Sequence, residues 1–455
     1  MNESSASQSA FAIAYEYTLR YYPRWFTWVQ LNLPTANQAP GSSSPGSIVN
    51  RLAGPLGMGP EYKIVVAIND DTVYAQAFLD VSAEPVILTL PSYRFIYSVL
   101  QLDVFGTVLS TPLTDNPPPG GGTYAFVAPG WSGTLPEGAV TVEMPVTSSE
   151  LILRVDKWSP DGIDLTKLAS EFRKNMILQP LSKYDPSCTS MECGRTFIAP
   201  LFNYAASAKL MADEGIAFAP EAFLRTLQAA MASDTTAPLD DGDHALIAAF
   251  NERFDAAQTM SARDSLPLSE ILRGAQAAHA ALINRWQSNR GSTNWIHFNN
   301  IGDWGKNYLD RAALTEYIQF GNNAPAAYYA NAFVDGSGVP LDGSQFGYTL
   351  TFTKDQLPQY KRFWSLTAYT PLAIELVPNP LDKYLVASYT PGLVYDLDGS
   401  VTIYIAAEHP ENAPIANWLP VPKSSFSMLF RVYGPKGTAQ SGEYVVPAIH
   451  RVPIR

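Results

Sequence analysis

The chain changes its hydrophobic pattern twice, and the order of these patterns limits the folds that its 455 residues can adopt. Short apolar runs bounded by Asn, Asp, Pro or Ser fill two blocks, about residues 62–155 and 348–455, and such runs are typical of antiparallel strands joined by turns. Between the blocks, over residues 165–286, apolar residues recur with a helical period, as Phe250 and Phe254 do. This order predicts a mainly β protein of the α+β class, in which two sandwich-like domains flank a helical insert.

A helix is also predicted at the N-terminus. Phe11, Ala14 and Leu19 recur on one side of residues 7–22. Pro23 is expected to end this helix, because proline lacks the backbone N–H that the next turn needs. The whole chain therefore divides into four expected parts: residues 1–35 with the N-terminal helix and an aromatic segment, residues 36–160 with the first β-sandwich domain, residues 161–310 with the helical insert, and residues 311–455 with the second β-sandwich domain.

Composition and charge exclude several kinds of partner. Hydrophobic residues make up 46% of the chain and charged residues only 16%, so the chain can bury a large core. The 42 acidic residues outnumber the 30 basic ones, and the net charge of −12 repels nucleic acid. No apolar stretch approaches the roughly 18 residues of a membrane-spanning helix, and the first residues lack the basic region of a signal peptide. We therefore expect a cytoplasmic protein with no nucleic-acid or membrane partner.

The sequence offers no recognisable metal or cofactor site. Its five histidines do not occur at the spacing of metal ligands. Its two cysteines, Cys188 and Cys193, do not form a C-x-x-C motif and are either ordinary thiols or a local disulfide. The acidic run at residues 240–243 directly precedes an amphipathic helix, where acidic side chains cap backbone amides. We therefore expect no cofactor and no metal, and a helix cap at residues 240–243.

Polar side chains interrupt two apolar strands of the first block. Asn69 and Asp71 share one parity of a strand, and Tyr97, Gln101 and Asp103 share one parity of another. Each set is therefore expected on one face of its strand. Carboxylates, amides and phenols inside a sandwich must be hydrogen-bonded or functional. Two interpretations stay open: a satisfied polar network that serves only the fold, and a ligand site.

These residues also carry a resemblance to a known pair of families. The family of proteins of unknown function 1254 is similar to this chain over residues 69–74 and 84–86 and at Tyr97, Gln101 and Asp103. Its usual tandem partner, family 1214, is similar over residues 363–369, 376–380, 398–400, 403–405, 417–420 and 431–435. The resemblance implies two jelly-roll-like β-sandwich domains with helical additions, and it transfers no catalytic residues because the family name records no activity. Asp70 departs from the family's usual asparagine, and its charge beside Asp71 is expected to raise the pKa of one carboxyl.

The aromatic content of 12%, the polar side chains in apolar strands and the missing cofactor motifs together favour an enzyme. We expect it to act without a cofactor on a bulky, largely apolar small molecule, as a cyclase, isomerase, lyase or hydrolase of specialised metabolism. The candidate catalytic residues are Asp71 and Asp103 as general acid or base, and Tyr74 and Tyr97 as donors. The candidate substrate-binding residues are Asn69, Gln101, Trp364, Tyr369 and Arg431, although a tryptophan such as Trp364 is also a typical core residue.

Two other functions stay open. A glycan- or ligand-binding module without turnover is compatible with the acidic and aromatic composition. A structural or assembly protein of double-jelly-roll type is the second alternative, and large apolar surface patches would favour it. A homo-oligomer is compatible with all three functions.

Overall fold

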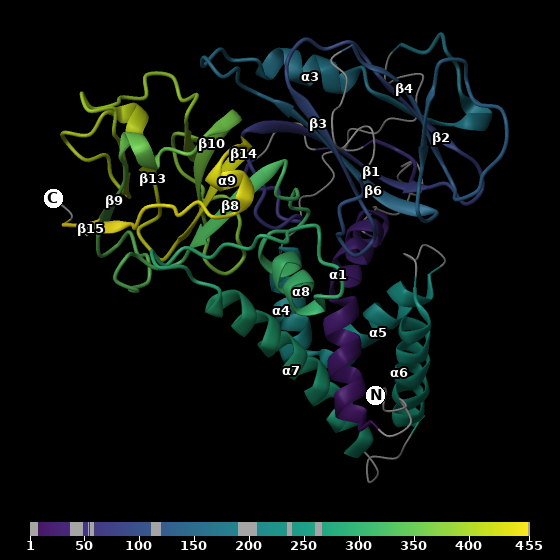
Figure 1. Ribbon diagram of the computed structural model, residues 1–455. Helices are drawn as coiled ribbons and strands as arrows, with labels where there is room; N and C mark the ends of the chain where they lie inside the picture. Colours follow the sequence, from purple (N-terminus) through teal and green to yellow (C-terminus); the bar gives the residue numbers. More distant parts are fainter. Residues whose placement is uncertain are drawn as a thin grey trace.

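The computed structural model describes residues 8–36, 49–52, 54, 59–110, 120–189, 207–233, 239–259 and 266–453. Within these residues the chain forms two β-rich units and one helical unit. Figure 1 shows the two β-rich units side by side, with the helices gathered along one side of both. The three units therefore meet in the middle of the molecule.

The N-terminal β-rich unit is a sandwich of two sheets. One sheet has the order β1 (Thr72–Asp80), β6 (Ser148–Asp156) and β3 (Tyr97–Leu102). The other has the order β5 (Val140–Glu143), β4 (Gly122–Val127), β2 (Val86–Leu90) and β7 (Ile177–Pro180). The helix α3 (Thr166–Lys174) packs against β1 and β6. Because β7 pairs with β2, this sandwich continues past residue 160, where the sequence pattern had placed its end.

The C-terminal β-rich unit is a second sandwich, with two four-stranded sheets. One sheet has the order β11 (Leu385–Ala387), β10 (Tyr360–Tyr369), β14 (Ser427–Pro435) and β8 (Ala327–Ala332). The other has the order β13 (Trp418–Pro420), β12 (Val401–Ala406), β9 (Gly347–Phe352) and β15 (His450–Val452). The short helix α9 (Thr438–Ser441) lies against β14 and β8.

Strand alternation decides which side chains of the sandwiches face the middle of the molecule. In β14, Phe430 and Val432 belong to the sandwich core, whereas Tyr433 packs in the cluster of the helical unit. In β6, the core residues Leu151 and Leu153 likewise leave Arg154 on the opposite face. The outer faces of β1, β6, β10 and β14 meet the helical unit. We call this region the junction.

Within the described residues the helical unit consists of six helices, one of them central. They are α1 (Ala10–Ala36), α4 (Ala208–Phe218), α5 (Pro220–Ala232), α6 (Asp241–Thr259), α7 (Leu266–Ser288) and α8 (Tyr308–Tyr317). The central helix α1 contacts α5, α6, α7 and α8. Its approach to α7 depends on Gly274, because a Cβ there would lie 2.5 Å from the backbone oxygen of Phe11. The packing of α1 against its neighbours therefore organises this unit.

The prediction that Pro23 ends the first helix is wrong, since α1 continues to Ala36. The side chains around this proline are large, aromatic and buried, namely Tyr21, Tyr22, Trp25 and Phe26. A proline inside a helix costs about 3 kcal/mol. Each fully buried large apolar side chain stabilises by about 1.5–3 kcal/mol, so the packing of this aromatic set outweighs the defect.

The predicted α+β class is confirmed by four sheets and a helical unit within the described residues, and the jelly-roll connectivity stays a prediction. None of the described helices combines the length and the apolar character that a bilayer crossing requires. Cys188 is disulfide-bonded, and Cys193 lies outside the described residues.

Candidate functional site

Five of the nine predicted site residues lie together at the junction, namely Asn69, Asp71, Tyr74, Tyr369 and Arg431. Asp71 is fully buried and accepts hydrogen bonds from the Tyr389 hydroxyl at 2.5 Å and the Ser365 hydroxyl at 3.1 Å. Asn69 donates to the Tyr433 hydroxyl at 2.6 Å. Both side chains therefore connect the N-terminal sandwich to the C-terminal one.

Arg431 uses its donors inside the protein. It donates to the backbone oxygen of Ala67 at 2.5 Å and to the Thr367 hydroxyl at 3.3 Å. Its guanidinium lies 5.5 Å from the ring centroid of Tyr369, whose hydroxyl donates to the backbone oxygen of Ile68. These contacts give Arg431 and Tyr369 a role in joining the two sandwiches.

Burial dominates the electrostatics of the two neighbouring aspartates. Burial raises the pKa of Asp71, while hydrogen bonding by Tyr389 and the charge of Arg431 oppose the rise. Burial also raises the pKa of Asp70, which forms an ion pair with Lys157 at 2.6 Å. The charge of Asp71 adds to the rise at Asp70, so the expected repulsion is present as a contribution smaller than burial.

The other four predicted residues lie elsewhere. Tyr97 packs in the core of the N-terminal sandwich, and Gln101 donates to the Ser149 hydroxyl at 3.0 Å. Asp103 accepts two backbone N–H groups of its own turn at 2.9 and 2.8 Å. Trp364 lies in the core of the C-terminal sandwich. The structure therefore does not bring these residues into one site with Asp71.

A small cavity lies at the junction beside Tyr74. Its volume is about 30 Å³, which is room for about two water molecules. Its walls come from β1, β6, the segment 65–68 and the segment that follows α8. Arg154, Gln319 and Phe320 are among the lining residues. We call this space the junction cavity.

Arg154 carries a buried charge without a carboxylate partner among the described residues. Its terminal nitrogens donate to Asn322 Oδ1 at 3.3 Å and to the backbone oxygen of Phe320 at 3.1 Å. Its Nε has no hydrogen-bond partner in the part of the chain that the structure describes. Burial alone lowers the pKa of Arg154, but the surrounding tyrosines, first among them Tyr74, raise it above its ordinary value. Burial also raises the pKa of Glu150 well above its usual range against the effect of Arg154, which favours a neutral Glu150 that supplies no countercharge.

A second buried donor at the junction cavity also lacks an acceptor. Gln319 Oε1 accepts the backbone N–H of Val66 at 3.3 Å, and Gln319 Nε2 has no partner within the described residues. Two other lining residues have left-handed backbones, Ala67 with φ 57° and Phe320 with φ 56°. Such strain in non-glycine residues concentrates at functional sites. The cavity therefore combines unused donors with strained walls, and sequence reasoning did not select any of these four residues.

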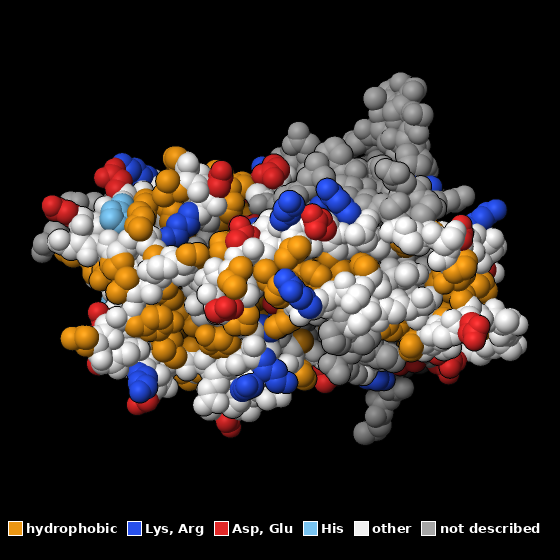
Figure 2. All heavy atoms as spheres, turned by 90° about the horizontal axis from the view of Figure 1, so that it is seen from above, with side chains coloured by type: hydrophobic (Ala, Val, Ile, Leu, Met, Phe, Trp, Pro, Cys, Tyr) orange, Lys and Arg blue, Asp and Glu red, His pale blue; other side chains and the backbone are white. Residues whose placement is uncertain are grey.

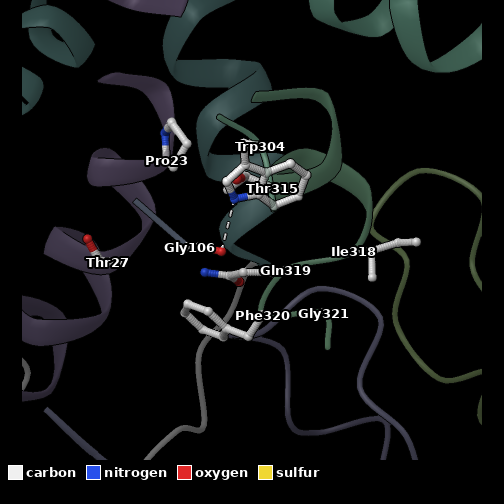
Figure 3. Close-up of a pocket in the computed structure, with 9 residues that line it drawn as sticks. All are labelled: Pro23, Thr27, Gly106, Trp304, Thr315, Ile318, Gln319, Phe320 and Gly321. Atoms are coloured by element: carbon white, nitrogen blue, oxygen red, sulfur yellow. Dashed lines mark hydrogen bonds between the residues drawn. The ribbon is translucent and has the colours of Figure 1, made fainter. Parts of the chain in front are cut away.

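Gln319 and Phe320 also line a second cavity (Figure 3). This space has a volume of about 10 Å³ and is mainly apolar. On its other side the indole N–H of Trp304 donates to the backbone oxygen of Gly106 at 3.1 Å. The segment that follows α8 is thus the wall between two small cavities.

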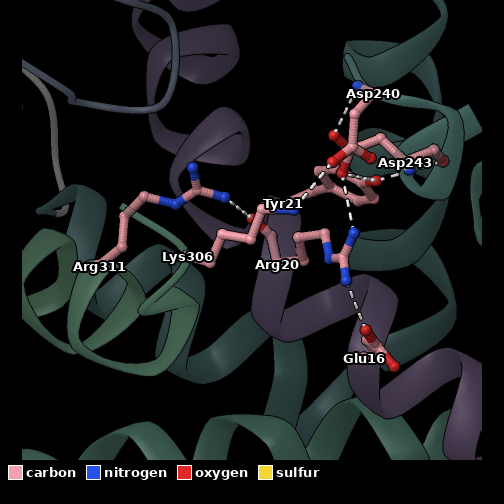
Figure 4. A network of polar contacts seen from close by, with 7 residues as sticks. All are labelled: Glu16, Arg20, Tyr21, Asp240, Asp243, Lys306 and Arg311. Atoms are coloured by element: carbon pink, nitrogen blue, oxygen red, sulfur yellow. Dashed lines mark hydrogen bonds and ion pairs between the residues drawn. The ribbon is translucent and has the colours of Figure 1, made fainter. Parts of the chain in front are cut away.

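A polar network that joins α1 to the start of α6 serves the fold (Figure 4). Arg20 and Tyr21 of α1 both donate to Asp243 Oδ1, at 3.0 and 2.8 Å. Asp240 accepts the backbone N–H of Asp243 at 2.9 Å at the start of α6. This bond confirms the helix cap predicted for residues 240–243.

A second buried network, which we call the helical ion cluster, contains Tyr22, Lys209, Asp213, His279 and Glu316. Lys209 Nζ lies 2.7 Å from Asp213 Oδ2 and 2.7 Å from Glu316 Oε1. His279 Nε2 lies 3.0 Å from Asp213 Oδ1, and the Tyr22 hydroxyl donates to Glu316 Oε2 at 2.5 Å. Asp213, His279 and Glu316 have the mutual spacing of metal ligands, but the Lys209 ammonium already supplies a cation between the two carboxylates.

Comparison with known proteins confirms the predicted tandem families. The model described as "Protein of unknown function (DUF1254)" matches residues 49–180, and "Protein of unknown function (DUF1214)" matches residues 326–437. No curated protein matches the chain. A crystal structure of a protein from Vibrio parahaemolyticus is 21% identical, covers 98% of this chain and 100% of its own, and has a TM-score of 0.58, which shows a shared fold. A putative uncharacterised protein from Burkholderia cenocepacia is 13% identical over 96% of this chain and 88% of its own, with a TM-score of 0.43.

Proposed function

The chain belongs to the proteins in which DUF1254 precedes DUF1214, and we propose that it binds a largely apolar small molecule through an acidic oxygen at the junction cavity. The observation that carries this proposal is a pair of buried donors, Arg154 Nε and Gln319 Nε2. They have no acceptor among the residues that the structure describes, although both side chains line one cavity. A buried polar group without a partner costs about 1–3 kcal/mol. A carboxylate or enolate oxygen placed between them would recover this free energy.

The same arrangement supports catalysis by an isomerase, lyase or cyclase. A fixed guanidinium and a fixed amide donor stabilise an oxyanion that develops during a reaction, and they do so best where water is excluded. Tyr74, Ile152 and Phe320 supply apolar wall beside them. A ligand-binding module without turnover would use identical contacts, so a test for turnover of the bound molecule separates these two functions.

The test compares two small probes of similar size, acetate and acetamide, by thermal unfolding. We expect acetate to raise the Tm of the wild-type protein more than acetamide does, because only acetate carries the negative countercharge that the Arg154 guanidinium lacks. In Gln319→Glu the new carboxylate occupies the acceptor position, so this variant is expected to fold and to lose the acetate response. Gln276→Glu, whose amide donates to helical carbonyls outside the cavity, is the matched control and keeps the response. An equal acetate response in wild type and Gln319→Glu would disprove the proposal.

A second function, contact with another copy or another protein, is favoured by exposed apolar loops of the C-terminal unit. Figure 2, which shows the molecule from above, has apolar side chains gathered on its left side, over the C-terminal unit. Leu372 is 71% exposed, Leu397 fully exposed and Ile415 60% exposed. We expect Leu397→Asp combined with Ile415→Asp to lower the oligomeric mass in light scattering, and an unchanged monomer in both proteins would remove this candidate.

A further inference from the structure

The helical ion cluster holds an unbalanced charge unless it binds a proton. Lys209 contributes one positive charge, whereas Asp213 and Glu316 contribute two negative charges when both are ionised. An uncompensated charge is unfavourable at Glu316, because its side chain is fully buried. Burial accordingly raises the pKa of Glu316 to about 7, against the opposing charge of Lys209. The other described titratable side chain that faces the cluster is Tyr317, whose ring centroid lies 4.9 Å from Lys209 Nζ.

The cluster is directly connected to the wall of the junction cavity. Glu316 lies in the last turn of α8 (Tyr308–Tyr317), and the backbone N–H of Ile318 closes that turn on the oxygen of Leu314 at 2.7 Å. The next two residues, Gln319 and Phe320, line the junction cavity. A displacement of this turn therefore moves the strained wall of the cavity.

We propose that the helical ion cluster is a pH-dependent latch on the junction cavity. With Glu316 protonated, its contacts to α1 and α4 hold the end of α8 in place, and Gln319 and Phe320 close the cavity. With Glu316 ionised, the excess negative charge favours release of the last turn of α8, which widens the cavity for the apolar part of a ligand. The role in ligand entry rests on the proposed function, whereas the latch itself is a property of the protein alone.

The size of the effect follows from proton linkage. A carboxyl whose pKa is about 7 in the closed state and 4.5 when released makes the opening equilibrium rise about tenfold between pH 6 and pH 8. Opening of one helical turn exposes its backbone amides to solvent exchange. Hydrogen exchange therefore reports the latch without any ligand.

The experiment measures hydrogen exchange by mass spectrometry over residues 308–322 at pH 6 and pH 8, with each rate divided by its intrinsic chemical rate. We expect the corrected rate of the wild-type protein to rise about tenfold, and that of Glu316→Gln to be the same at both pH values. Glu408→Gln, which removes an exposed ion pair with Lys423, is the matched control and keeps the rise. His279→Gln also keeps it, because the latch depends on Glu316.

Three results would overturn the latch: a corrected wild-type rate that does not change with pH, a rise that persists in Glu316→Gln, or a rise that disappears in His279→Gln. The wild-type measurement alone decides the matter if a variant fails to fold. Failure of the latch is distinguishable from failure of the proposed function. If the acetate response is missing but exchange depends on pH as expected, only the proposed ligand binding is contradicted. If the acetate response is present but exchange does not depend on pH, only the latch is contradicted.

Discussion

The hydrogen bond between Tyr389 and Asp71 is expected to be a principal link between the two sandwiches. Tyr389→Phe removes the hydroxyl that donates to Asp71 at 2.5 Å and keeps the ring contacts to Trp158 and Phe363. Ser365 remains as a donor to Asp71 at 3.1 Å. A hydrogen bond to a charged, buried group contributes about 1.5–3 kcal/mol. We therefore expect Tyr389→Phe to lower the free energy of unfolding by about 2 kcal/mol.

A double-mutant cycle with Asp71→Asn isolates this contact. Urea unfolding of the wild type, the two single variants and the double variant is expected to give a coupling energy of about 1.5–2 kcal/mol. Tyr384→Phe is the matched control, because the Tyr384 hydroxyl donates to the exposed carboxylate of Asp382 at 2.8 Å. Removal of this exposed bond is expected to cost less than about 1 kcal/mol. A coupling energy near zero for Tyr389 and Asp71 would refute the reasoning.

Three further predictions concern stability. Because the pKa of Glu316 is raised to about 7, protonated Glu316 stabilises the folded protein fully below its ordinary pKa. This stabilisation is lost as the pH rises through 7. The free energy of unfolding of wild type relative to Glu316→Gln should therefore fall by ~2–3 kcal/mol from pH 5 to pH 8, and a flat difference would contradict the assignment. Trp364→Ala, in the core of the C-terminal sandwich, should cost about 3–5 kcal/mol in urea unfolding while keeping the acetate response; loss of that response in folded protein would return Trp364 to the site. Ala67→Gly should stabilise by about 1 kcal/mol because Ala67 has a φ of 57°, and destabilisation would show that its methyl packing outweighs the strain.

Local patterns were sufficient wherever one segment decides its own structure. The cap at Asp240 depends on residues three positions apart, and the strand that contains Arg431 depends on its own apolar run. Tandem motifs along the C-terminal block likewise identified the family. The sequence also carried a usable signal for Arg154 that was not recognised: Glu150, Arg154 and Asp156 share one parity of a strand whose residues 151–153 and 155 are apolar.

The sequence by itself therefore determined the β-rich, helical, β-rich order, the family and the periodic faces of the strands. Only the tertiary structure decided which face borders the junction, so that Tyr369 lies at the junction and Trp364, on the same strand, lies in the core. It also brought Gln319 to the cavity of Arg154, although 165 residues separate them in the chain. The physical reason is burial and long-range packing. They set the free energy of an unpaired polar group, and they keep α1 helical through Pro23. Neither effect is encoded in the neighbouring residues of the chain.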